Sequence, residues 1–581
     1  MSITGNWDRR RRVSRREFLV ASGMGAAGLA LGTHGLWLPG RGLAQTSTDP
    51  SYPFKLGVAS GDPLPNSVVL WTRLTPGNPL TGGGPPASTT VTWQVATDAS
   101  FATIVRKGTA TASSQFAYSL HIDAGVQGDT GQSSLAPSTT YYYRFKNGIY
   151  TSPTGRTKTA PASGASVSSM RLAFASCQHW ESGLYPAYRH MAQQQSLDLV
   201  VHLGDYIYEG APTKNPPIAG RQHSTVAEPS WGCNTLADYR NRHAQYKTDP
   251  DLRAAHAQHP WVCTWDDHEV ENDYAGTKSW YRQSDFALRR ANAYRAYYEH
   301  MPLRDSVLVR KTDGTIDWSR LNLYRSITYG TLAQLLVLDL RQYRTEQPCG
   351  DQGSLIETSC KDRLQDPITR TNRRHTILGG PTLGTTPGQD AQEIWLKGRL
   401  TSSGPTWNAI AQQVIMFQYD HRSWYGNWYS ESWDSYVATR DRILRHIVDK
   451  SVRNPVVLTG DMHSSWAANL ESSFNDTTNT DIIGSEFAGT SISSGLSTGS
   501  GSWDEIYRNA LTYNKHVKYY NGRTGGYVLC KVTPRYWQSD YYVADSLSSG
   551  SSPVSRRASW YAEAPVPGGT KVGVRAGTPL G

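Results

Sequence analysis

Cysteine is scarce in this chain, with 6 in 581 residues. So low a content excludes a small scaffold that depends on a dense disulfide framework. Cys349 and Cys360 flank a short polar loop and could pair, whereas Cys233, Cys263 and Cys530 are each compatible with burial or with pairing. The length predicts more than one domain.

A concentrated positive charge and a long apolar run are also absent beyond the first 44 residues. The formal charge is +10, but residues 1–44 hold seven Arg against Asp8 and Glu17, a net +5 that leaves +5 on the rest. No basic block interleaved with aromatic residues follows, so no nucleic-acid partner is indicated. No later segment is long and apolar enough for a membrane helix. The mild positive balance is compatible with anionic substrates.

Residues 1–44 have the pattern of a twin-arginine export signal. Four consecutive Arg from Arg9 lead into Ser-Arg-Arg-Glu-Phe-Leu at 14–19, and a weakly apolar stretch rich in Gly and Ala ends near Ala44. Arg pairs also precede ordinary anchors or helices, but this stretch is too weakly apolar to span a bilayer comfortably. We therefore expect the twin-arginine machinery to export the folded chain to a periplasm or to the cell exterior.

Composition divides the remainder into segments. From about residue 52 to 159, short alternating strands are separated by Gly, Pro, Ser and Asp turns. This pattern predicts a β-sandwich of immunoglobulin or fibronectin type III kind. A linker rich in Pro, Ala, Ser and Gly follows at 160–169. Residues 546–581 are rich in Gly, Pro and Ser, which favours a surface wrap or a disordered tail.

Residues 170–545 alternate apolar runs with helical patterns. Strands are predicted at 171–176, 197–203, 261–265, 333–339 and 454–459, and helices at 185–195, 236–247 and 250–257. Strand and helix repetition of this kind predicts an α/β catalytic domain around a largely buried sheet.

Four turn-like motifs lie beside apolar runs and together supply a mixed set of metal donors. They are Phe-Ala-Ser-Cys at 174–177, Gly-Asp-Tyr-Ile-Tyr at 204–208, Trp-Asp-Asp-His-Glu at 265–269 and Gly-Asp-Met-His at 460–463. Loops at strand ends are where α/β sheets build sites. A lone Gly-Asp is usually only a turn. A thiolate, an imidazole and a phenolate beside several carboxylates instead indicate a site for a transition metal and a hard cation, as in enzymes that hydrolyse phosphate esters.

The softer donors suit a transition metal. Cys177 as a thiolate would select one, and His463 supplies an imidazole. Asp205 can offer its two oxygens to two cations at once, which makes it a candidate bridging and catalytic carboxylate. Tyr208 lies one helical turn further along, and its phenol ionises readily only beside a strongly charged centre such as ferric iron. Taken alone, Cys177 could be a small buried hydrophobe and Tyr208 a packed core tyrosine.

The harder donors suit a second kind of ion. Asp461 and Asp267 are placed to bind it, while Asp266 is a candidate supporting residue or turn cap. His268 is then free to point at the substrate and to donate to a phosphate or leaving-group oxygen, with a structural histidine as the alternative. Arg341 follows an apolar strand and could add a bidentate phosphate contact. It could equally pair with carboxylates.

These motifs, in this order after a twin-arginine signal, resemble those of PhoD-type alkaline phosphatases. That family belongs to the wider purple acid phosphatase and calcineurin-like metallophosphoesterase group. The likeness covers nearly the whole chain, including Gly-Val-Ala-Ser-Gly-Asp-Pro at 57–63, Leu-Asp-Leu-Arg-Gln-Tyr-Arg at 338–344 and Tyr-Tyr-Asn-Gly at 519–522. It implies a metallophosphoesterase catalytic domain, in which a β-sandwich is flanked by helices.

The resemblance also implies a centre with one ferric ion (Fe3+) and two calcium ions (Ca2+). Because the twin-arginine route carries folded proteins, we expect the metal to be inserted before export. The iron ligands carried over from the family are Cys177, Asp205, Tyr208 and His463. The calcium ligands carried over are Asp205, Asp267 and Asp461, with Asn272 or Asp273 as a candidate for one more. Related calcineurin-like enzymes have Asn at the position of Asp267 and His at that of Asp461. Both differences replace neutral donors with anionic oxygens, as expected where calcium replaces a divalent transition metal.

The implied activity is hydrolysis of phosphate monoesters, and of some diesters, by a metal-activated hydroxide that attacks in line with the leaving group. The sequence contains nothing like a serine-phosphatase elbow or a Walker phosphate loop. The alternative is a phosphodiesterase or phospholipase D acting on lipid headgroups or cell-wall polymers. Four aromatic residues could then line a wider entrance or simply pack together: Trp424, Tyr425, Trp428 and Trp433. A third hypothesis is a non-catalytic binding protein with structural metals.

Overall fold

The computed structural model describes residues 49–224, 232–350, 355–356, 360, 375–379, 391–402, 404–422, 427–474, 481–495, 502–565 and 573–579. The predicted export signal at 1–44 lies outside these residues. Within them, no helix is both long and apolar enough to cross a membrane.

Two large sheets dominate the described part of the chain. The strands of the first sheet are, in spatial order, β26 (Arg575–Ala576), β25 (Val554–Glu563), β24 (Tyr536–Ala544), β23 (Gly526–Val532), β9 (Met170–Ala175), β10 (Leu199–Leu203), β11 (Pro260–Thr264), β1 (Val58–Leu64), β2 (Ser67–Arg73) and β5 (Ser119–Asp123). Its central strands β9, β10, β11 and β1 run parallel to one another.

The strands of the second sheet are, in spatial order, β14 (Arg325–Tyr329), β15 (Ala333–Val337), β17 (Trp407–Gln412), β19 (Pro455–Thr459), β21 (Ile482–Ala488), β20 (Ser465–Glu471) and β22 (Val517–Asn521). Here β15, β17, β19 and β21 are parallel. Every residue of β10, β11 and β19 is buried. Burial on both faces explains why these strands are almost continuous apolar runs in the sequence.

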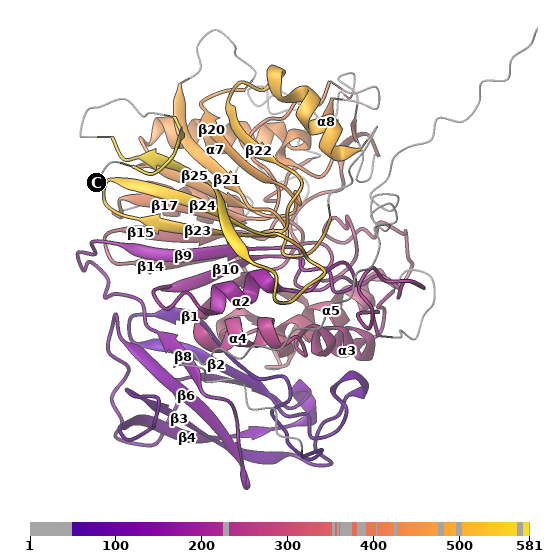
Figure 1. Ribbon diagram of the computed structural model, residues 1–581, viewed down its shortest axis with the longest axis vertical. Helices are drawn as coiled ribbons and strands as arrows, with labels where there is room; N and C mark the ends of the chain where they lie inside the picture. The colour runs from indigo at the N-terminus through magenta and orange to yellow at the C-terminus, as the bar shows by residue number, and fades with distance from the viewer. Residues whose placement is uncertain are drawn as a thin grey trace, which may run out of the picture.

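The two sheets face each other, and helices cover their outer sides (Figure 1). Apolar residues from both sheets, among them Phe174, Val201 and Leu458, form the core between them. The helices whose residues pack with the first sheet are α2 (Pro186–Ala192), α3 (Leu236–Tyr246), α4 (Pro250–Gln258) and α5 (Phe286–His300). Those that pack with the second sheet are α6 (Ala391–Thr401), α7 (Val437–Asp449) and α8 (Trp503–Ala510). This arrangement agrees with the expected sandwich flanked by helices.

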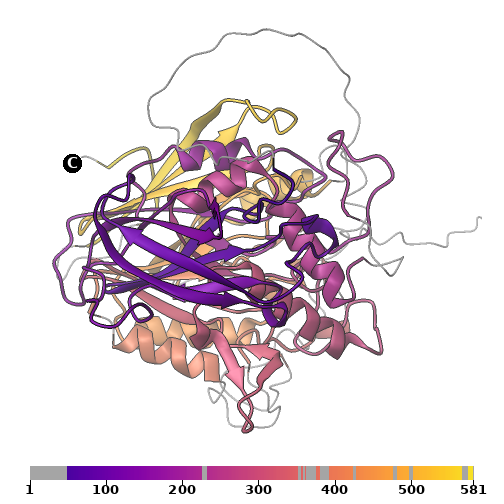
Figure 2. The ribbon, with the colours of Figure 1, turned by 90° about the horizontal axis from the view of Figure 1, so that it is seen from below.

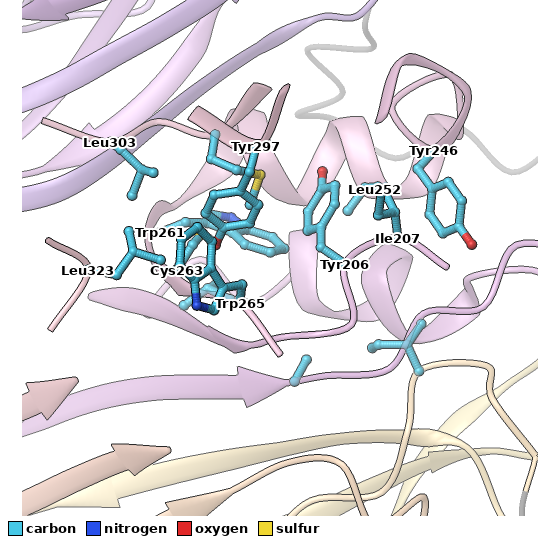
Figure 3. Close-up of a cluster of buried hydrophobic side chains, with 14 of the residues drawn as sticks. Tyr206, Ile207, Tyr246, Leu252, Trp261, Cys263, Trp265, Tyr297, Leu303 and Leu323 are labelled. Carbon is cyan, nitrogen blue, oxygen red and sulfur yellow. The ribbon is translucent and has the colours of Figure 1, made fainter. Parts of the chain in front are cut away.

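The helices on the first sheet are fixed by caps and by aromatic packing. Thr235 and its N3 residue form a capping box at the start of α3, and Asp249 caps α4 ahead of a proline. Trp265 directly follows β11 and stacks on Tyr294 of α5, with 4.2 Å between ring centroids. Figure 3 shows Trp265 and Tyr297 packed together beside the sheet. The loop after β11 is therefore held on a rigid base.

The expected N-terminal β layer is present, but it shares a sheet with the catalytic part. A smaller sheet packs on β1, β2 and β5 and is seen in front in Figure 2; its strands are β4 (Ile104–Ala112), β3 (Thr89–Ala96), β6 (Thr140–Asn147), β7 (Tyr150–Thr151) and β8 (Gly155–Lys158). Leu70 and Ile122 on one side meet Trp93 and Tyr143 on the other. Because β1, β2 and β5 belong to the first large sheet, residues 160–169 do not mark an end of that sheet. The immunoglobulin or fibronectin type stays a prediction.

Of the two possibilities for the tail after residue 546, disorder is wrong for its middle part. There β25 pairs along its length with β24, and β26 pairs with β25. Ala558, Trp560 and Ala562 alternate along β25 and pack against the core between the two large sheets. Polar segments on both sides of β25 make this alternation of apolar residues difficult to recognise in the sequence.

Smaller features complete the described structure. Two pairs of strands form separate ribbons: β12 (Leu308–Arg310) with β13 (Ile316–Leu321), and β16 (Leu355–Ile356) with β18 (Trp428–Tyr429). Cys349 and Cys360 form a disulfide, so that pairing is confirmed. The other four cysteines are buried and free.

Candidate metal centre

The four motifs lie together at strand ends that come from both large sheets. Cys177, Asp205 and Asp267 follow β9, β10 and β11, which are parallel neighbours, while Asp461 and His463 follow β19 of the facing sheet. The carboxyl ends of parallel strands meet at one edge of a sheet. Two edges of this kind therefore converge on one place.

The donor atoms form two overlapping groups. Cys177, Asp205 and His463 each offer one donor atom within 4.8 Å of the other two. The same limit is met by a set of carboxylates, namely Asp205, Asp266, Asp267 and Asp461. Asp205 belongs to both groups, as a ligand that bridges two ions must. We call the residues of these two groups, together with Tyr208, the donor cluster.

Several of these residues have a backbone conformation that is rare for side chains other than glycine. The φ angles are 60° at Cys177, 55° at Asp205, 58° at Asp461 and 50° at His463. Each such residue costs on the order of 1–3 kcal/mol and persists only where the surrounding structure imposes it, typically at functional sites. Gly204 has a φ of 103°, and a Cβ there would lie 2.4 Å from the Cβ of the residue after Trp265. Only glycine allows this close approach.

Tyr208 directs its phenol at the carboxylate shared by the two groups. Its oxygen lies 2.9 Å from Asp205 Oδ2 and 3.2 Å from His463 Nε2. The Ser494 hydroxyl donates to the same oxygen at 2.7 Å. The His268 ring packs on the Tyr208 ring, with 4.1 Å between centroids. The phenol is thus aimed at the donor atoms and is not simply packed in a core.

Burial disfavours the charged forms of these donors. The pKa of the Cys177 thiol is raised well above its ordinary value by burial and by the Asp205 carboxylate. Burial and Asp205 likewise raise the pKa of Tyr208. The pKa of Asp205 is itself raised, by burial first and by Asp267 and Glu269 in addition. A cation among them would favour the ionised forms of all of these groups.

His268 is held by a carboxylate outside the predicted set. Its Nδ1 lies 2.7 Å from Glu209 Oε2, and Glu209 Oε1 accepts the Asn272 N–H at 2.8 Å. Burial lowers the pKa of His268, but Glu209, Asp205 and Asp267 outweigh burial and the pKa is raised well above its ordinary value. The contact with Glu209 fixes the orientation of the imidazole through Nδ1.

Arg341 pairs with carboxylates of the centre. Its guanidinium is fully buried, donates to Asp266 and pairs with Glu431 at 2.5 Å. Its Nη2 lies 3.6 Å from Asp267 Oδ1 and 3.8 Å from Asp461 Oδ1. The alternative of pairing with carboxylates is confirmed, and substrate binding by Arg341 stays a prediction. Arg341 places a fixed positive charge behind the carboxylates.

Two further groups meet the same distance limit: one formed by Asp205, Asp267 and His268, and a separate one formed by His179, Glu181 and His223. The separate group makes hydrogen bonds of its own. The Tyr246 hydroxyl accepts two backbone N–H groups at 3.0 and 3.1 Å, so its own proton goes to His223 Nε2, 3.0 Å away. Neutral His223 then carries its proton on Nδ1, the atom 3.9 Å from Glu181 Oε2. In this tautomer Nδ1 is a donor and Nε2 an acceptor.

Comparison with known proteins identifies the family. The sequence model described as PhoD-like phosphatase matches residues 172–541, and that of the N-terminal domain of PhoD-like phosphatases matches residues 42–161. The chain belongs to the PhoD-like phosphatase family. It is 45% identical over 560 residues to alkaline phosphatase D of Bacillus subtilis (strain 168), covering 94% of this chain and 87% of that protein. A solved structure of PhoD is 44% identical, with a TM-score of 0.78 over 91% of this chain and 93% of that one.

Membership of the PhoD-like phosphatase family makes the chain a phosphoric ester hydrolase. The resemblance inferred from the motifs is confirmed, and the hypothesis of a non-catalytic binding protein is wrong. The roles of individual residues and the identity of the metals stay predictions.

The donor chemistry fits the ions expected for a PhoD-like phosphatase. Asp205 Oδ1 is buried and has no hydrogen-bond partner in the described structure, so a carboxylate oxygen at the centre is left open. Asp205 shares one group with the thiol of Cys177 and another with three further carboxylates, and the Tyr208 phenol contacts it directly. Softer and harder donors around one shared carboxylate suit two kinds of ion.

Several carboxylates that hold the centre of this PhoD-like phosphatase together are not among the predicted site residues. Besides Glu209 and Glu431, Glu269 accepts backbone N–H groups from Asp205 at 3.1 Å and from Asp266 at 2.8 Å, which joins the loops after β10 and β11. The available signal was position, because Glu209 and Glu269 each stand one residue after a motif donor. Asp273, a candidate calcium ligand, donates its N–H to Asp267 Oδ2 at 2.6 Å and so lies beside the carboxylates.

Proposed function

We propose that this chain is an exported alkaline phosphatase that releases inorganic phosphate from phosphate monoesters and from some diesters. The observation that carries the proposal is the pair of donor groups that share Asp205 at the converging strand ends. The 45% identity to an alkaline phosphatase D supports the same activity. Export by the twin-arginine machinery, to a periplasm or beyond, is proposed from residues 1–44 alone.

The proposed metals are one Fe3+ and two Ca2+. Iron would be held by Cys177, Asp205, Tyr208 and His463. Calcium would be held by Asp205, Asp267 and Asp461. When bound, these ions would neutralise charge on the phosphoryl oxygens and activate the attacking water. A thiolate and a phenolate are ligands for a transition metal, whereas carboxylates suit calcium.

The chain's own residues position the reacting groups. His268, oriented by Glu209, holds a proton that it can donate to the leaving-group oxygen, which stabilises the departing alkoxide. Arg341 binds Asp266 and keeps the carboxylates in place. Burial of the whole centre strengthens each of these electrostatic contacts.

A phospholipid headgroup or a cell-wall polymer is the alternative substrate class, with phospholipase D or phosphodiesterase activity. Trp433 is fully buried and donates to Gln412 Oε1 at 2.7 Å, and Trp428 is also buried. These two residues therefore pack in the interior and do not line an entrance. Trp424 and Tyr425 lie outside the described residues.

The test compares kcat/KM for p-nitrophenyl phosphate, bis(p-nitrophenyl) phosphate and phosphatidylcholine vesicles, with exported enzyme before and after calcium chelation. We expect a monoester preference that chelation abolishes, and elemental analysis that finds iron and calcium. A preference for the vesicles would transfer the activity to phospholipase D. Zinc in place of both iron and calcium would overturn the assignment of the metals.

A further inference from the structure

The turn at residues 491–494 is hydrogen-bonded to the loop that carries Cys177, one of the proposed iron ligands. The proposed iron ligands of the donor cluster are called its iron side. The N–H groups of Ser493 and Ser494 both donate to the Cys177 carbonyl, at 3.3 and 3.2 Å, and the Ile492 N–H donates to the Ser176 carbonyl at 3.0 Å. The backbone of the turn is therefore fixed to the loop that carries Cys177.

Ser494 adds a side-chain contact to a second predicted iron ligand. Its hydroxyl oxygen lies 2.7 Å from the Tyr208 phenol oxygen and 2.9 Å from the Cys177 carbonyl oxygen. The side chain is buried, at 3% exposure, so water does not compete freely for these contacts. One residue thus touches groups from the loops after both β9 and β10.

Ser494 has a single hydroxyl proton, and the surrounding contacts indicate that it donates this proton to the Tyr208 oxygen. The Cys177 carbonyl already accepts two backbone N–H groups, and the His179 N–H donates to Ser494 Oγ at 3.3 Å. The Tyr208 proton has its own acceptor in Asp205 Oδ2, at 2.9 Å. The phenol oxygen is therefore an acceptor for the Ser494 hydroxyl.

We propose that Ser494 is a positioning residue for the iron side, whose hydroxyl holds the Tyr208 oxygen in place and reduces its electron donation to Fe3+. The inference rests on the proposed function, because it takes Tyr208 as an iron ligand. A hydrogen bond to an ionised oxygen is shorter and stronger than one to a neutral oxygen, so the contact tightens when Tyr208 binds as a phenolate. Residues that hold a ligand in this way change metal affinity or activity by about 10–100-fold when removed.

The same turn contains a matched control. Ser493 is as deeply buried as Ser494, but its hydroxyl donates to the His179 carbonyl at 2.8 Å and contacts no predicted ligand. Ser493→Ala therefore removes an equivalent buried hydroxyl from the same turn without touching Tyr208.

The experiment records the visible absorption of iron-loaded, exported enzyme, in which a phenolate bound to Fe3+ gives a charge-transfer band. We expect Ser494→Ala to move this band to lower energy, because a phenolate without its hydrogen bond is a stronger donor. Iron affinity, measured by competition with a chelator, should fall about 10–100-fold. Ser493→Ala should leave both the band and the affinity unchanged.

If Ser494→Ala is not exported in folded form, the pair Ser494→Thr and Ser494→Val compares two side chains of one shape with and without the hydroxyl. The threonine variant should keep the wild-type band and the valine variant should not. Wild-type enzyme with a band that none of these changes moves would overturn the role of Ser494 alone. Iron-loaded wild type with no phenolate band would overturn both this inference and Tyr208 as a ligand.

Discussion

Two buried polar clusters differ in the kind of ionisable side chain that they contain. The donor cluster is rich in acids, and burial raises the pKa of Cys177, Asp205 and Tyr208. A second cluster, here called the basic cluster, comprises Arg73, His202, His243, Lys247, His256 and His300, all buried. Burial lowers the pKa of each: that of His202 to about 3, that of Lys247 to about 7 and that of Arg73 to about 10.

The two clusters differ in what could offset the effect of burial on the pKa values of their side chains. The basic cluster makes neutral contacts: Lys247 donates to the Tyr206 hydroxyl at 3.0 Å, and Tyr206 meets His256 Nε2 at 2.8 Å. Ring nitrogens of His202, His243 and His256 have no hydrogen-bond partner in the described structure, and a neutral imidazole can tolerate this. The donor cluster leaves Asp205 Oδ1 open and stands at strand ends. Burial alone therefore does not mark a catalytic centre. A catalytic centre is marked instead by buried acids that are arranged so that cations could bind between them.

Removing the shared carboxylate should have the largest effect. Asp205→Asn keeps the shape of the side chain but removes the charge common to both donor groups, so we expect kcat/KM to fall at least about 10³-fold. Metal content by elemental analysis should fall with it. Asp198→Asn is the control, because Asp198 pairs with Lys158 away from the cluster and its loss should leave the metal content unchanged. Wild-type turnover by Asp205→Asn would show that Asp205 is not a bridging ligand.

Removing the buried guanidinium should have the next largest effect. Arg341→Met removes the guanidinium that binds Asp266 and one of the two that bind Glu431, and breaking a buried pair costs about 3–5 kcal/mol of unfolding free energy. Denaturant unfolding measures this cost. Arg344→Met is matched, because Arg344 also pairs with Glu431 at 2.5 Å but not with Asp266. Both variants should lose stability and only Arg341→Met should lose calcium; equal calcium in both would deny Arg341 a role at the donor cluster.

Local patterns in the sequence account for much of this fold. Apolar runs predicted β9, β10, β11, β15 and β19, and the cap at Asp249 agrees with the predicted start of α4. Which runs share a sheet was not predictable, because pairing depends on contacts distant in sequence. The merging of β1, β2 and β5 with the catalytic sheet, and the strand β25 in the polar tail, are both of this kind.

The candidate site was predictable from the sequence to about the same extent as the fold. The donor residues follow apolar runs and carry recognisable chemistry, so their position could be inferred. The partner of Arg341 could not, because Glu431 lies in no motif and approaches only in three dimensions. Ser494 is one of several serines in its segment, and nothing local distinguishes it from Ser493.

Removing the cations should destabilise the protein more as pH rises. The folded pKa of Asp205 is raised, so in metal-free protein its contribution to stability is present below about pH 3.8–3.9, the unfolded value, and is lost as pH rises through the folded pKa. Bound ions should offset this loss of stability. The stabilisation amounts to about 3 kcal/mol when the free ion concentration is one hundred times Kd. The Tm of loaded and chelated enzyme, measured from pH 4 to 9, should therefore diverge towards high pH. A gap that narrows with pH would contradict the cation requirement.

The basic cluster should give the smallest effect, with a pH dependence of its own. Lys247 has a folded pKa of about 7 against 10.5 unfolded. Its contribution to stability is present above the unfolded value and is lost as pH falls through the folded one. This loss amounts to about 2 kcal/mol between pH 9 and 7. Lys247→Met should remove that part of the slope, measured by denaturant unfolding at the two pH values, while the exposed-site control Lys107→Met should keep it. An unchanged slope in Lys247→Met would mean that Lys247 stays charged in the core, and the basic cluster would then need an anion just as the donor cluster needs cations.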